Sequence, residues 1–356
     1  MTILLYGAYG YTGLRIARHA ADLGDKLNAD ILLSGRDAAR LDAVSRETGF
    51  PAEPMSLDDE RGLHDLVARA DVILHCAGPF IHTARPMLEA CLRTGTHYTD
   101  ITGEIQVFEM AHDLHARAVE ANVVLIPGVG MDVVPSDCLA AKLAGRCPDA
   151  SELELAFASD VAGISPGTAK TMVENLGSSG AARIDGRIEP VPNAWKVRRI
   201  DFGSFATTCM TIPWGDVSTA YYSTGIPNIT VFTGVGQKTA TWVRRLRSVS
   251  GLMGWRPIRS LLQAIIDRRV DGPGDEVLAT GRTFFRGWAR TADGREEELG
   301  LTTPQGYRIT VLAALESALR VGHGAVDAGF QTPSRAFGAD YITTFDGCAW
   351  IETDER

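Results

Sequence analysis

The sequence lacks the features that mark several large classes of protein. It has no run of about eighteen apolar residues, so no segment is expected to span a membrane. Its 35 basic residues face 44 acidic ones, and the net charge of −9 argues against a nucleic-acid-binding protein, which is usually basic. The opening residues, MTILLYG, already have the pattern of a strand and leave no room for a secretory leader. We therefore expect a cytoplasmic protein.

Paired cysteines and metal-ligand clusters are also missing. The six cysteines form no C-x-x-C pair and are scattered along the chain, which favours reduced, buried thiols. His112 and His115 are three residues apart on an expected helix, but no cysteine or carboxylate cluster joins them. The sequence therefore predicts no metal site.

The first part of the chain alternates strand and helix patterns. With 356 residues, of which 45% are hydrophobic, the chain can bury a large core and favours two domains. Strand patterns occupy residues 2–6, 30–34, 53–56, 71–77, 96–101 and 122–127. Six strands joined by five helical crossovers predict an α/β fold, a doubly wound parallel sheet of the Rossmann type, over residues 1–135.

The pattern changes after about residue 135. Residues 151–158 alternate polar and apolar side chains, as a half-exposed antiparallel strand does. Further strand patterns occupy residues 206–212, 228–233, 276–285 and 307–311, and Asp-Gly turn signals stand at 185–186, 271–272 and 293–294. We expect a second α+β domain on a mixed sheet over residues 136–305, for substrate binding or oligomerisation. A late helix over 310–321 predicts that residues 306–356 return to pack on the Rossmann domain.

Three glycines at a spacing of three follow the first strand. A side chain at Gly7 would obstruct the turn from strand to helix, one at Gly10 would keep the backbone from a pyrophosphate, and Gly13 lets the helix lie close to the strand. The helix N-terminus then offers N–H groups to phosphates. Glycines also mark ordinary turns, so the triplet alone is weak evidence. The expected loop consists of Gly7, Ala8, Tyr9, Gly10, Tyr11, Thr12 and Gly13.

The end of the second strand distinguishes between two dinucleotides. An NAD site usually has an acidic residue here that accepts hydrogen bonds from the ribose, whereas this chain has Ser34, Gly35 and Arg36. Arg36 could pair with the 2′-phosphate of NADP, and Ser34 could add a hydroxyl bond. Asp37 follows and could turn inward; alternatively, Arg36 is solvated and Asp37 only caps the next helix. The sequence favours NADP.

Two later segments are candidates for the rest of the nucleotide. Asp58, after the third strand, could accept a hydrogen bond from the adenine amino group or could be a plain helix cap. At the end of the fourth strand, in the crevice where the nicotinamide ribose would lie, stand Cys76, Ala77, Gly78 and Pro79. Their small side chains permit close approach, although a simple Gly-Pro turn would also explain them.

Several motifs occur together in a fixed order. They are GAYGYTG (7–13), SGRD (34–37), HCAGPF (75–80), GTHYTDITGE (95–104) and PGVGMDVVPSD (127–137). As a set they resemble the saccharopine dehydrogenase-like oxidoreductases, in particular the bacterial branch that includes trans-acting enoyl reductases. Further matches at ISPGTAKTMVENL, PWGDVSTAYYSTGIPNI and QTPSRAFG extend the resemblance over nearly the whole chain. The resemblance implies a Rossmann domain with NADP, an inserted substrate domain and reduction of an activated double bond.

Hydride transfer needs positioning and a proton donor more than a strong nucleophile. Tyr98 and Asp100 are two residues apart at the end of the fifth strand, so their side chains share one face near the carboxyl edge of the sheet. Asp132 follows the sixth strand beside the same crevice, where a buried carboxylic acid could have a raised pKa and donate a proton. Alternatively, Asp100 caps the following helix together with Thr102 and Glu104.

The second domain is expected to supply the substrate walls. Residues 165–168 have the pattern of a capped helix start, whose N–H groups could hold a carboxylate or a thioester oxygen. Tyr221 and Tyr222 are candidate phenolic donors, although tyrosines in strands usually serve packing. Residues 241–270 contain seven arginines among apolar residues and only one acidic residue, Asp267. Such a segment suits an anionic membrane surface, a carrier protein or a phosphorylated acyl substrate, but also a core helix or the interface of a homodimer.

Together these features predict an NADP-dependent reductase that acts on an activated C=C bond of an acyl or isoprenoid-like substrate, a lipid-like small molecule. The runner-up is a saccharopine-type enzyme that joins or splits a C–N bond. It would have to anchor two carboxylates, and the few basic residues expected near the crevice, chiefly Arg85 and Lys170, make it less attractive. A non-catalytic NADP-binding scaffold or sensor is a third alternative, because no acid–base pair stands out.

Overall fold

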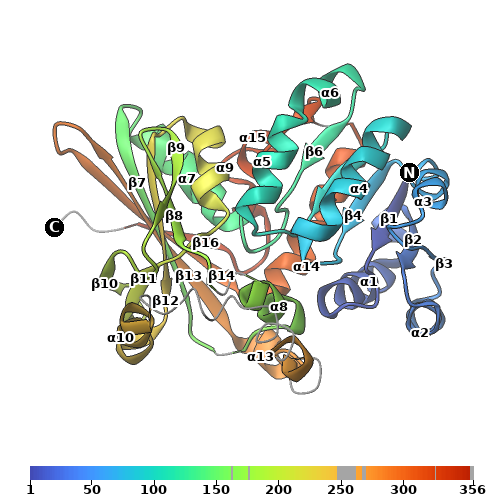
Figure 1. Cartoon of the computed structure of the whole chain (residues 1–356), viewed down its shortest axis with the longest axis horizontal. Coiled ribbons are helices and arrows are strands. Elements are labelled where there is room, and N and C mark those ends of the chain that lie inside the picture. Colours follow the sequence, from blue (N-terminus) through green and yellow to red (C-terminus); the bar gives the residue numbers. More distant parts are fainter. Residues whose placement is uncertain (162, 175–176, 247–261, 267–269, 325, 353–356) are drawn as a thin grey trace. The chain divides into compact units, whose positions relative to one another are not determined.

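The computed structural model describes residues 1–161, 163–174, 177–246, 262–266, 270–324 and 326–352 (Figure 1). The chain divides into two compact units. Unit 1 consists of Met1–Val134 and Tyr307–Phe337, and unit 2 consists of Pro135–Gly306 and Gly338–Arg356. Within the described residues, no helix is long and apolar enough to cross a membrane.

Unit 1 is built on a parallel sheet of seven strands in the order β15-β6-β5-β4-β1-β2-β3. These strands are β1 (Thr2–Tyr6), β2 (Asp30–Gly35), β3 (Ala52–Pro54), β4 (Val72–His75), β5 (His97–Asp100), β6 (Val124–Ile126) and β15 (Gly329–Phe330). The first six overlap the six expected strands, so the doubly wound parallel sheet is confirmed. The seventh, β15, pairs with β6 and has only two residues, too few for a periodic signal in the sequence.

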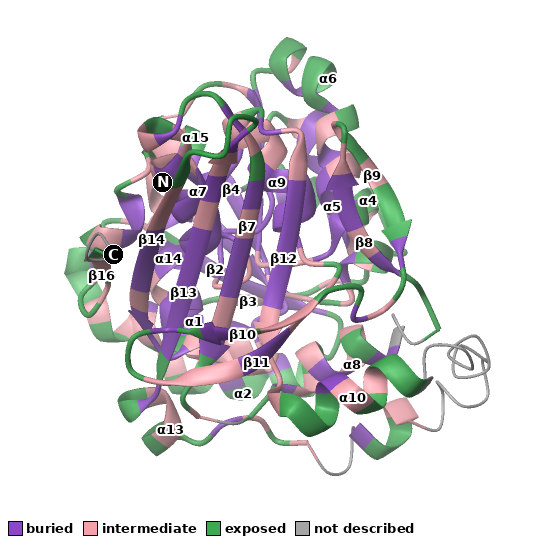
Figure 2. Ribbon diagram, turned by 90° about the vertical axis from the view of Figure 1, so that its left-hand side faces the viewer, coloured by how far each residue is buried: buried purple, intermediate pink, exposed green. Residues whose placement is uncertain are grey.

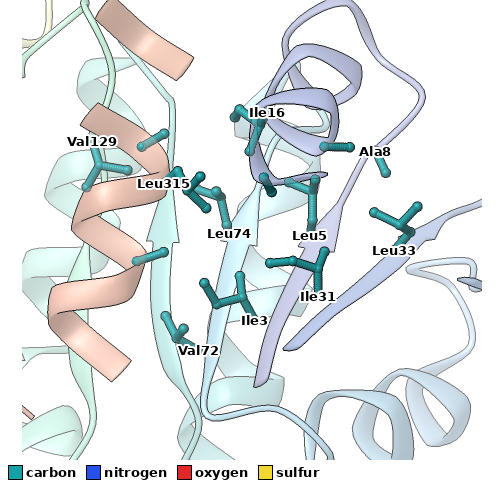
Figure 3. Packing of buried hydrophobic residues seen from close by; sticks show 14 of the residues in the cluster. Ile3, Leu5, Ala8, Ile16, Ile31, Leu33, Val72, Leu74, Val129 and Leu315 are labelled. Carbon is teal, nitrogen blue, oxygen red and sulfur yellow. The ribbon is translucent and has the colours of Figure 1, made fainter. Parts of the chain in front are cut away.

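Helices cover this sheet and complete its core. They are α1 (Tyr11–Leu23), η1 (Gly24–Leu27), α2 (Ala38–Thr48), α3 (Glu60–Val67), α4 (Phe80–Thr94), α5 (Ile105–Asp113), α6 (His115–Glu120), α14 (Gly306–Gly322) and α15 (Pro333–Phe337). In the core shown in Figure 3, alternate residues of β1, such as Ile3 and Leu5, pack with Ile16 of α1. Leu315 of α14 belongs to the same cluster, so the late helix packs in the core of unit 1.

Unit 2 is built on a mixed sheet in the order β10-β11-β12-β7-β13-β14-β16, with β8 paired to β12 and β9 paired to β8. Its strands are β7 (Ala150–Ser159), β8 (Gly180–Ile184), β9 (Arg187–Val191), β10 (Val197–Asp201), β11 (Ala206–Thr211), β12 (Asn228–Gly234), β13 (Arg282–Thr291), β14 (Glu296–Pro304) and β16 (Ala349–Glu352). Strand β7 pairs in parallel with β12 and antiparallel with β13, which confirms a mixed sheet. Buried residues run along β12 and β13, whereas β9 is largely exposed (Figure 2).

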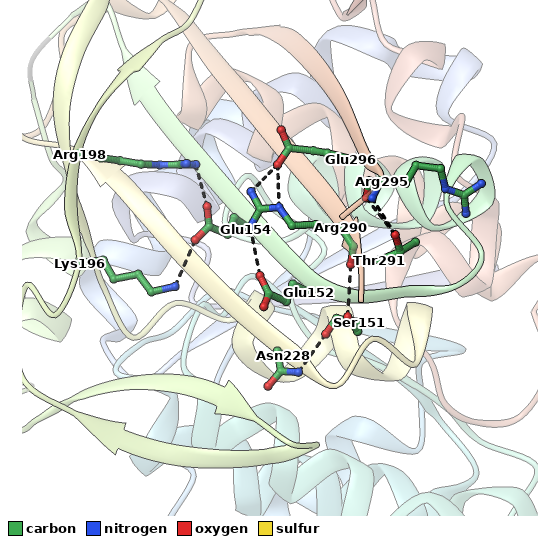
Figure 4. A network of polar contacts seen from close by, with 10 residues as sticks. All are labelled: Ser151, Glu152, Glu154, Lys196, Arg198, Asn228, Arg290, Thr291, Arg295 and Glu296. Carbon is green, nitrogen blue, oxygen red and sulfur yellow. Dashed lines mark hydrogen bonds and ion pairs between the residues drawn. The ribbon is translucent and has the colours of Figure 1, made fainter. Parts of the chain in front are cut away.

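The helices of unit 2 are α7 (Val134–Arg146), α8 (Pro166–Glu174), α9 (Asp216–Thr224), α10 (Gly236–Leu246), α13 (Asp275–Thr280) and the short η3 (Tyr341–Thr344). Charged side chains link several strands on one part of the sheet (Figure 4). The carboxylate of Glu154 on β7 lies 3.0 Å from the guanidinium of Arg198 and 3.3 Å from the ammonium group of Lys196. Arg290 of β13 pairs with Glu152 of β7 at 3.2 Å. Arg290 and Glu152 lie opposite one another on neighbouring strands, and a cross-strand pair of this kind contributes roughly 0.2–1 kcal/mol to the sheet.

The structure corrects three expectations about secondary structure. Residues 276–280 belong to α13 instead of a strand, because acidic residues in its first turn favour a helix N-terminus and Gly281 ends the helix. Residues 307–311 begin α14, since the apolar residues continue at helical spacing through Val321. Tyr221 and Tyr222 lie on helix α9 instead of a strand. The Asp-Gly signals at 185–186 and 293–294 do mark the β8–β9 and β13–β14 turns, where Gly186 and Gly294 have positive φ.

The expected C-terminal return is divided between the units. Residues 307–337 belong to unit 1, where they contribute α14 and β15. Residues 338–356 belong to unit 2, in which β16 pairs antiparallel with β14. The expectation that all of 306–356 packs on the Rossmann domain is therefore wrong for the last segment, because the unpaired edge of β14 provides a partner for β16. Of the arginine-rich segment, residues 247–261 and 267–269 lie outside the described residues.

We expect Gly13→Ala to destabilise unit 1, because the added Cβ would lie 2.3 Å from the carbonyl oxygen of Gly7. The backbone would have to shift, and overpacking of this kind costs about 1–3 kcal/mol. Gly145→Ala in α7 is the control, since its Cβ would meet nothing within 4 Å. Thermal unfolding without nucleotide checks the pair, and an unchanged transition for Gly13→Ala would contradict this close approach.

Candidate active site

The turn from β1 into α1 is shaped by backbone crowding. Gly7 has φ +85°, and an added Cβ would lie 2.8 Å from the amide nitrogen of Ala77. The amide of Gly7 donates to the carbonyl of Ser34 at 2.8 Å, and the amide of Gly10 donates to the carbonyl of Gly7 at 2.9 Å. Gly7 and Gly13 are therefore required by contacts inside the fold.

Gly10 is not required by its backbone conformation. It is the N-cap of α1 with φ −69° and ψ 166°, a conformation open to any residue. The nearest atom to an added Cβ would be the carbonyl oxygen of Gly7, at 3.2 Å. No side chain caps the helix here, and its first turn has no acidic residue. The absence of a side chain at Gly10 thus keeps the positive end of the helix dipole accessible to an anion.

At the end of β2, the structure separates the roles of the expected residues. Ser34 is fully buried and its hydroxyl donates to the carbonyl of Glu53 at 2.8 Å. The expected hydroxyl bond from Ser34 to a 2′-phosphate therefore does not fit this geometry. Asp37 caps α2, because its carboxylate accepts from the amide of Arg40 at 3.1 Å. Arg36 is exposed beyond the strand end.

Asp58 is exposed and does not cap α3. The hydroxyl of Ser56 donates to its carboxylate at 3.3 Å, and the amide of Asp58 donates to the Ser56 hydroxyl oxygen at 3.2 Å. The cap of α3 is Asp59, which accepts from the amide of Gly62 at 2.9 Å. The alternative that Asp58 caps a helix is therefore wrong, because the next residue, Asp59, is the cap.

The loop 76–79 after β4 is stabilised by hydrogen bonds of two residues that the sequence analysis missed. The hydroxyl of Thr83 donates to the carbonyl of Ala77 at 2.7 Å, and its oxygen lies 3.0 Å from Nε2 of His75. Because Thr83 uses its only hydrogen on Ala77, His75 donates from Nε2. Burial lowers the pKa of His75 to about 3, so the ring is neutral. In the sequence, the place of His75 in the motif HCAGPF, directly before the loop, could have indicated its role.

Tyr98 and Asp100 form a buried pair, as their alternation along β5 predicts. The phenol of Tyr98 donates to Oδ2 of Asp100 at 2.6 Å. The other oxygen, Oδ1, accepts from the amides of Thr102 at 2.9 Å and Gly128 at 2.8 Å. Burial raises the pKa of Asp100 to about 6 against the opposing effect of these three bonds, and it raises the pKa of Tyr98 well above its usual value. Asp100 thus ties β5 to the loop after β6.

Glu104 directly precedes α5, but its side chain caps the N-terminus of another helix, α4. Its two carboxylate oxygens accept from the amides of Phe80, at 2.8 Å, and Ile81, at 2.7 Å. These amides begin α4, which has Pro79 at its N-cap and no side-chain cap from its own chain segment. The interaction spans 24 residues of sequence, and so local helix-capping patterns could not have predicted it.

Asp132 lies in the loop after β6, beside Gly103. An added Cβ on Gly103 would lie 2.9 Å from Oδ2 of Asp132. Desolvation raises the pKa of Asp132 to about 7, and the nearby charge of Glu104 adds to this rise. Asp132 is also partly exposed, unlike the fully buried Asp100. An accessible acid with a pKa near neutrality can donate a proton.

The candidate residues of the second domain lie in unit 2. Ser165 caps α8, since its hydroxyl accepts from the amide of Thr168 at 3.1 Å, so the expected helix start is confirmed. On α9, the ring of Tyr221 packs against the guanidinium of Arg183 at 4.2 Å. Among the residues that the structure describes, no group of three or more histidine, cysteine, aspartate or glutamate side chains could hold a metal ion.

A family model and several known relatives match part of the chain. Residues 3–126 match the family model of the saccharopine dehydrogenase NADP-binding domain. The trans-acting enoyl reductase of Mycobacterium ulcerans is 33% identical over 160 residues, which cover 43% of this chain and 38% of that protein. The enzyme of the same name from Mycobacterium tuberculosis H37Rv is 37% identical over 141 residues, or 38% and 33% of the two chains. The chain thus spans little more than a third of the length of these relatives.

Solved structures match over nearly the whole chain at low identity. Saccharopine dehydrogenase (L-Glu forming) from Saccharomyces cerevisiae, in its apo form, has a TM-score of 0.69 and 13% identity over 98% of this chain and 99% of its own. Homospermidine synthase from Legionella pneumophila, solved with NAD, has a TM-score of 0.65 and 9% identity over 99% and 91%. At such identities the likeness shows the fold. Residues 3–126 are therefore similar to the saccharopine dehydrogenase NADP-binding domain, and the chain has the fold of saccharopine dehydrogenase.

Proposed function

We propose that this chain is an NADP-dependent oxidoreductase that transfers a hydride to an activated C=C bond of an acyl or isoprenoid-like substrate, a lipid-like small molecule. The observation that carries the proposal is the turn at Gly10, where the N-terminus of α1 has no side-chain cap and no acid in its first turn. This turn belongs to a domain whose family binds NADP. The name of the relatives, trans-acting enoyl reductase, supports an enoyl substrate.

The residues around this turn fit a dinucleotide. In our proposal the pyrophosphate lies over Gly10, within the loop of Gly7, Ala8, Tyr9, Gly10, Tyr11, Thr12 and Gly13. Beyond Gly35, the exposed Arg36 pairs with the 2′-phosphate, and Asp58 accepts from the adenine amino group. Residues 76–79 line the nicotinamide ribose. Ser34 acts through its carbonyl, which accepts the amide of Gly7 and so holds the loop.

The acidic residues at the ends of β5 and β6 have separate roles in this proposal. NADPH, when bound, supplies the hydride. Asp132 donates the proton that completes the reduced product, because it is the accessible acid whose pKa is about 7. Tyr98 and Asp100 position the loop that carries Asp132, through the bond from the amide of Gly128 to Asp100. Glu104 favours the protonated form of Asp132 by its negative charge.

The same acids disfavour the saccharopine-type alternative. A substrate with two carboxylates requires cations, but Asp100, Glu104 and Asp132 gather at this edge of unit 1. Arg85 is exposed on α4, and Lys170 lies on α8 of unit 2. The homodimer, and a membrane or carrier-protein contact through residues 241–270, stay predictions.

The substrate class can be tested by NADPH oxidation with a panel of enoyl thioesters and isoprenoid enones, against amino acid plus keto acid mixtures. We expect turnover with the enoyl compounds, because a neutral acid near the cofactor can protonate the carbon next to the carbonyl. Turnover only with the amino acid mixtures would move the assignment to C–N chemistry. Tight NADPH binding without consumption by any class would indicate a scaffold or sensor.

Gly10→Val is expected to weaken NADPH and NADH binding alike by about 10- to 100-fold, as the loss of charge-assisted bonds to the pyrophosphate implies. The conformation of Gly10 admits a valine, so the fold without nucleotide should be retained. Isothermal titration calorimetry measures the affinity, and circular dichroism controls for folding. Unchanged affinity in a folded variant would contradict the proposed pyrophosphate position.

Asp132 should control the pH dependence of reduction. The acid must carry its proton to donate it, so kcat should be high below the pKa of about 7 and should fall as the pH rises through that value. Asp132→Asn should lower kcat by about 10²- to 10⁴-fold and remove this limb of the profile. Asp113→Asn on the exposed face of α5 is the control. A profile that keeps its limb in Asp132→Asn would exclude Asp132 as the donor.

A further inference from the structure

The side chain of Tyr9 connects the glycine loop to the end of β2. Tyr9 stands between Gly7 and Gly10, and its ring lies against Gly35, where an added Cβ would come within 2.5 Å of Cε1 of the ring. Its hydroxyl accepts from the amide of Asp37 at 3.2 Å. Gly35 therefore makes room for an aromatic ring, and the ring fixes the distance between the loop and the segment that carries Arg36.

Arg40 is held against the ring and the backbone of Tyr9. Its guanidinium carbon lies 4.6 Å from the centre of the Tyr9 ring, and Nη2 donates to the carbonyl oxygen of Tyr9 at 3.1 Å. A guanidinium has five N–H donors, so this bond leaves most of them available. Within the described part of the chain, neither Arg36 nor Arg40 forms an ion pair with a carboxylate. Arg40 is thus an oriented cation beside the glycine loop.

The nearest acid to these two arginines is already engaged. The carboxylate of Asp37 accepts from the backbone amide of Arg40 as the cap of α2. An acid at the end of β2 would normally accept the ribose hydroxyls of NAD, but this one serves the helix. Two guanidinium groups therefore remain for a ligand at this edge, with the exposed carboxylate of Asp58 nearby, and a phosphate monoester carries close to two negative charges at neutral pH.

We propose that Arg40 is a second specificity-determining residue that binds the 2′-phosphate of NADP together with Arg36, and that Tyr9 positions it. This inference rests on the proposed function, because it assigns a role toward the same nucleotide. Arg40 approaches from α2, one turn after Arg36. The ring of Tyr9 limits the rotamers of Arg40, so less side-chain entropy is lost when the phosphate binds.

The test is direct binding to the protein without substrate. Isothermal titration calorimetry is performed with NADPH, NADH, 2′,5′-ADP and 5′-ADP on the wild type, Arg40→Gln and Arg46→Gln. Arg46 is an exposed cation on the same helix and provides the matched control for the loss of one charge. Arg40→Gln should weaken the binding of NADPH and 2′,5′-ADP by about 10- to 100-fold, because one charge-assisted contact with the 2′-phosphate is lost. The binding of NADH and 5′-ADP should weaken by less than about twofold. Arg46→Gln should bind all four ligands like the wild type.

The role of Tyr9 has its own readout. Tyr9→Leu should lower the ratio of NADPH to NADH affinity, whereas Tyr9→Phe keeps the ring face and should retain most of that ratio. Equal losses of affinity for NADPH and NADH in Arg40→Gln would show that Arg40 only supports the loop. No loss of affinity would show that Arg40 does not contact the nucleotide. Either result overturns the inference and leaves the oxidoreductase proposal intact. A wild type that binds neither nucleotide would overturn both.

Discussion

The packing of α1 onto the end of β1 is the constraint on which the rest of unit 1 depends. The carbonyl of Gly7 comes so close to Gly13 that any side chain at position 13 would clash with it. The same carbonyl accepts the amide of Gly10 and turns the chain into the helix. This turn aims the helix N-terminus at the edge where β4 and β5 also end. The proposed pyrophosphate site therefore arises from a packing requirement, before any charged residue contributes.

A second constraint is that the buried carboxylates at that edge of the sheet need hydrogen-bond donors. Glu104 accepts hydrogen bonds from two backbone amides, and Asp100 accepts from two amides and from the phenol of Tyr98, so both carboxylates stabilise loops and a helix start. Asp132 is the acid of the group that retains partial exposure. The proposed division between structural and reactive carboxylates thus follows from hydrogen bonding and access, because burial raises the pKa of Asp100 and Asp132 alike.

The sequence predicted those parts of the fold that local patterns encode. Apolar runs located β1, β2, β4 and β6, and Asp-Gly pairs located two hairpin turns. It misassigned residues 276–280 and 307–311, where apolar side chains at helical spacing also fit a short strand. Glu104 caps a helix that begins 24 residues earlier, and Thr83 supports Ala77 from α4. Such contacts depend on how strands and helices pack in three dimensions. The spacing of apolar residues along the sequence does not indicate them. Ser34 was misjudged because the register between β2 and β3 directs its hydroxyl to Glu53.

The composition of unit 1 from two distant segments has a consequence for biosynthesis. Val311, Ala314 and Leu315 of α14 belong to the same core as Ile3 and Leu5, and β15 covers the edge of β6. On a translating ribosome the first 134 residues emerge long before residues 307–337, and the whole insert is made in between. Until then, apolar side chains of the nascent chain and one sheet edge stay uncovered, a condition that favours chaperone binding or aggregation. The domain that the family model recognises is thus completed only when the ribosome has nearly finished this sequence.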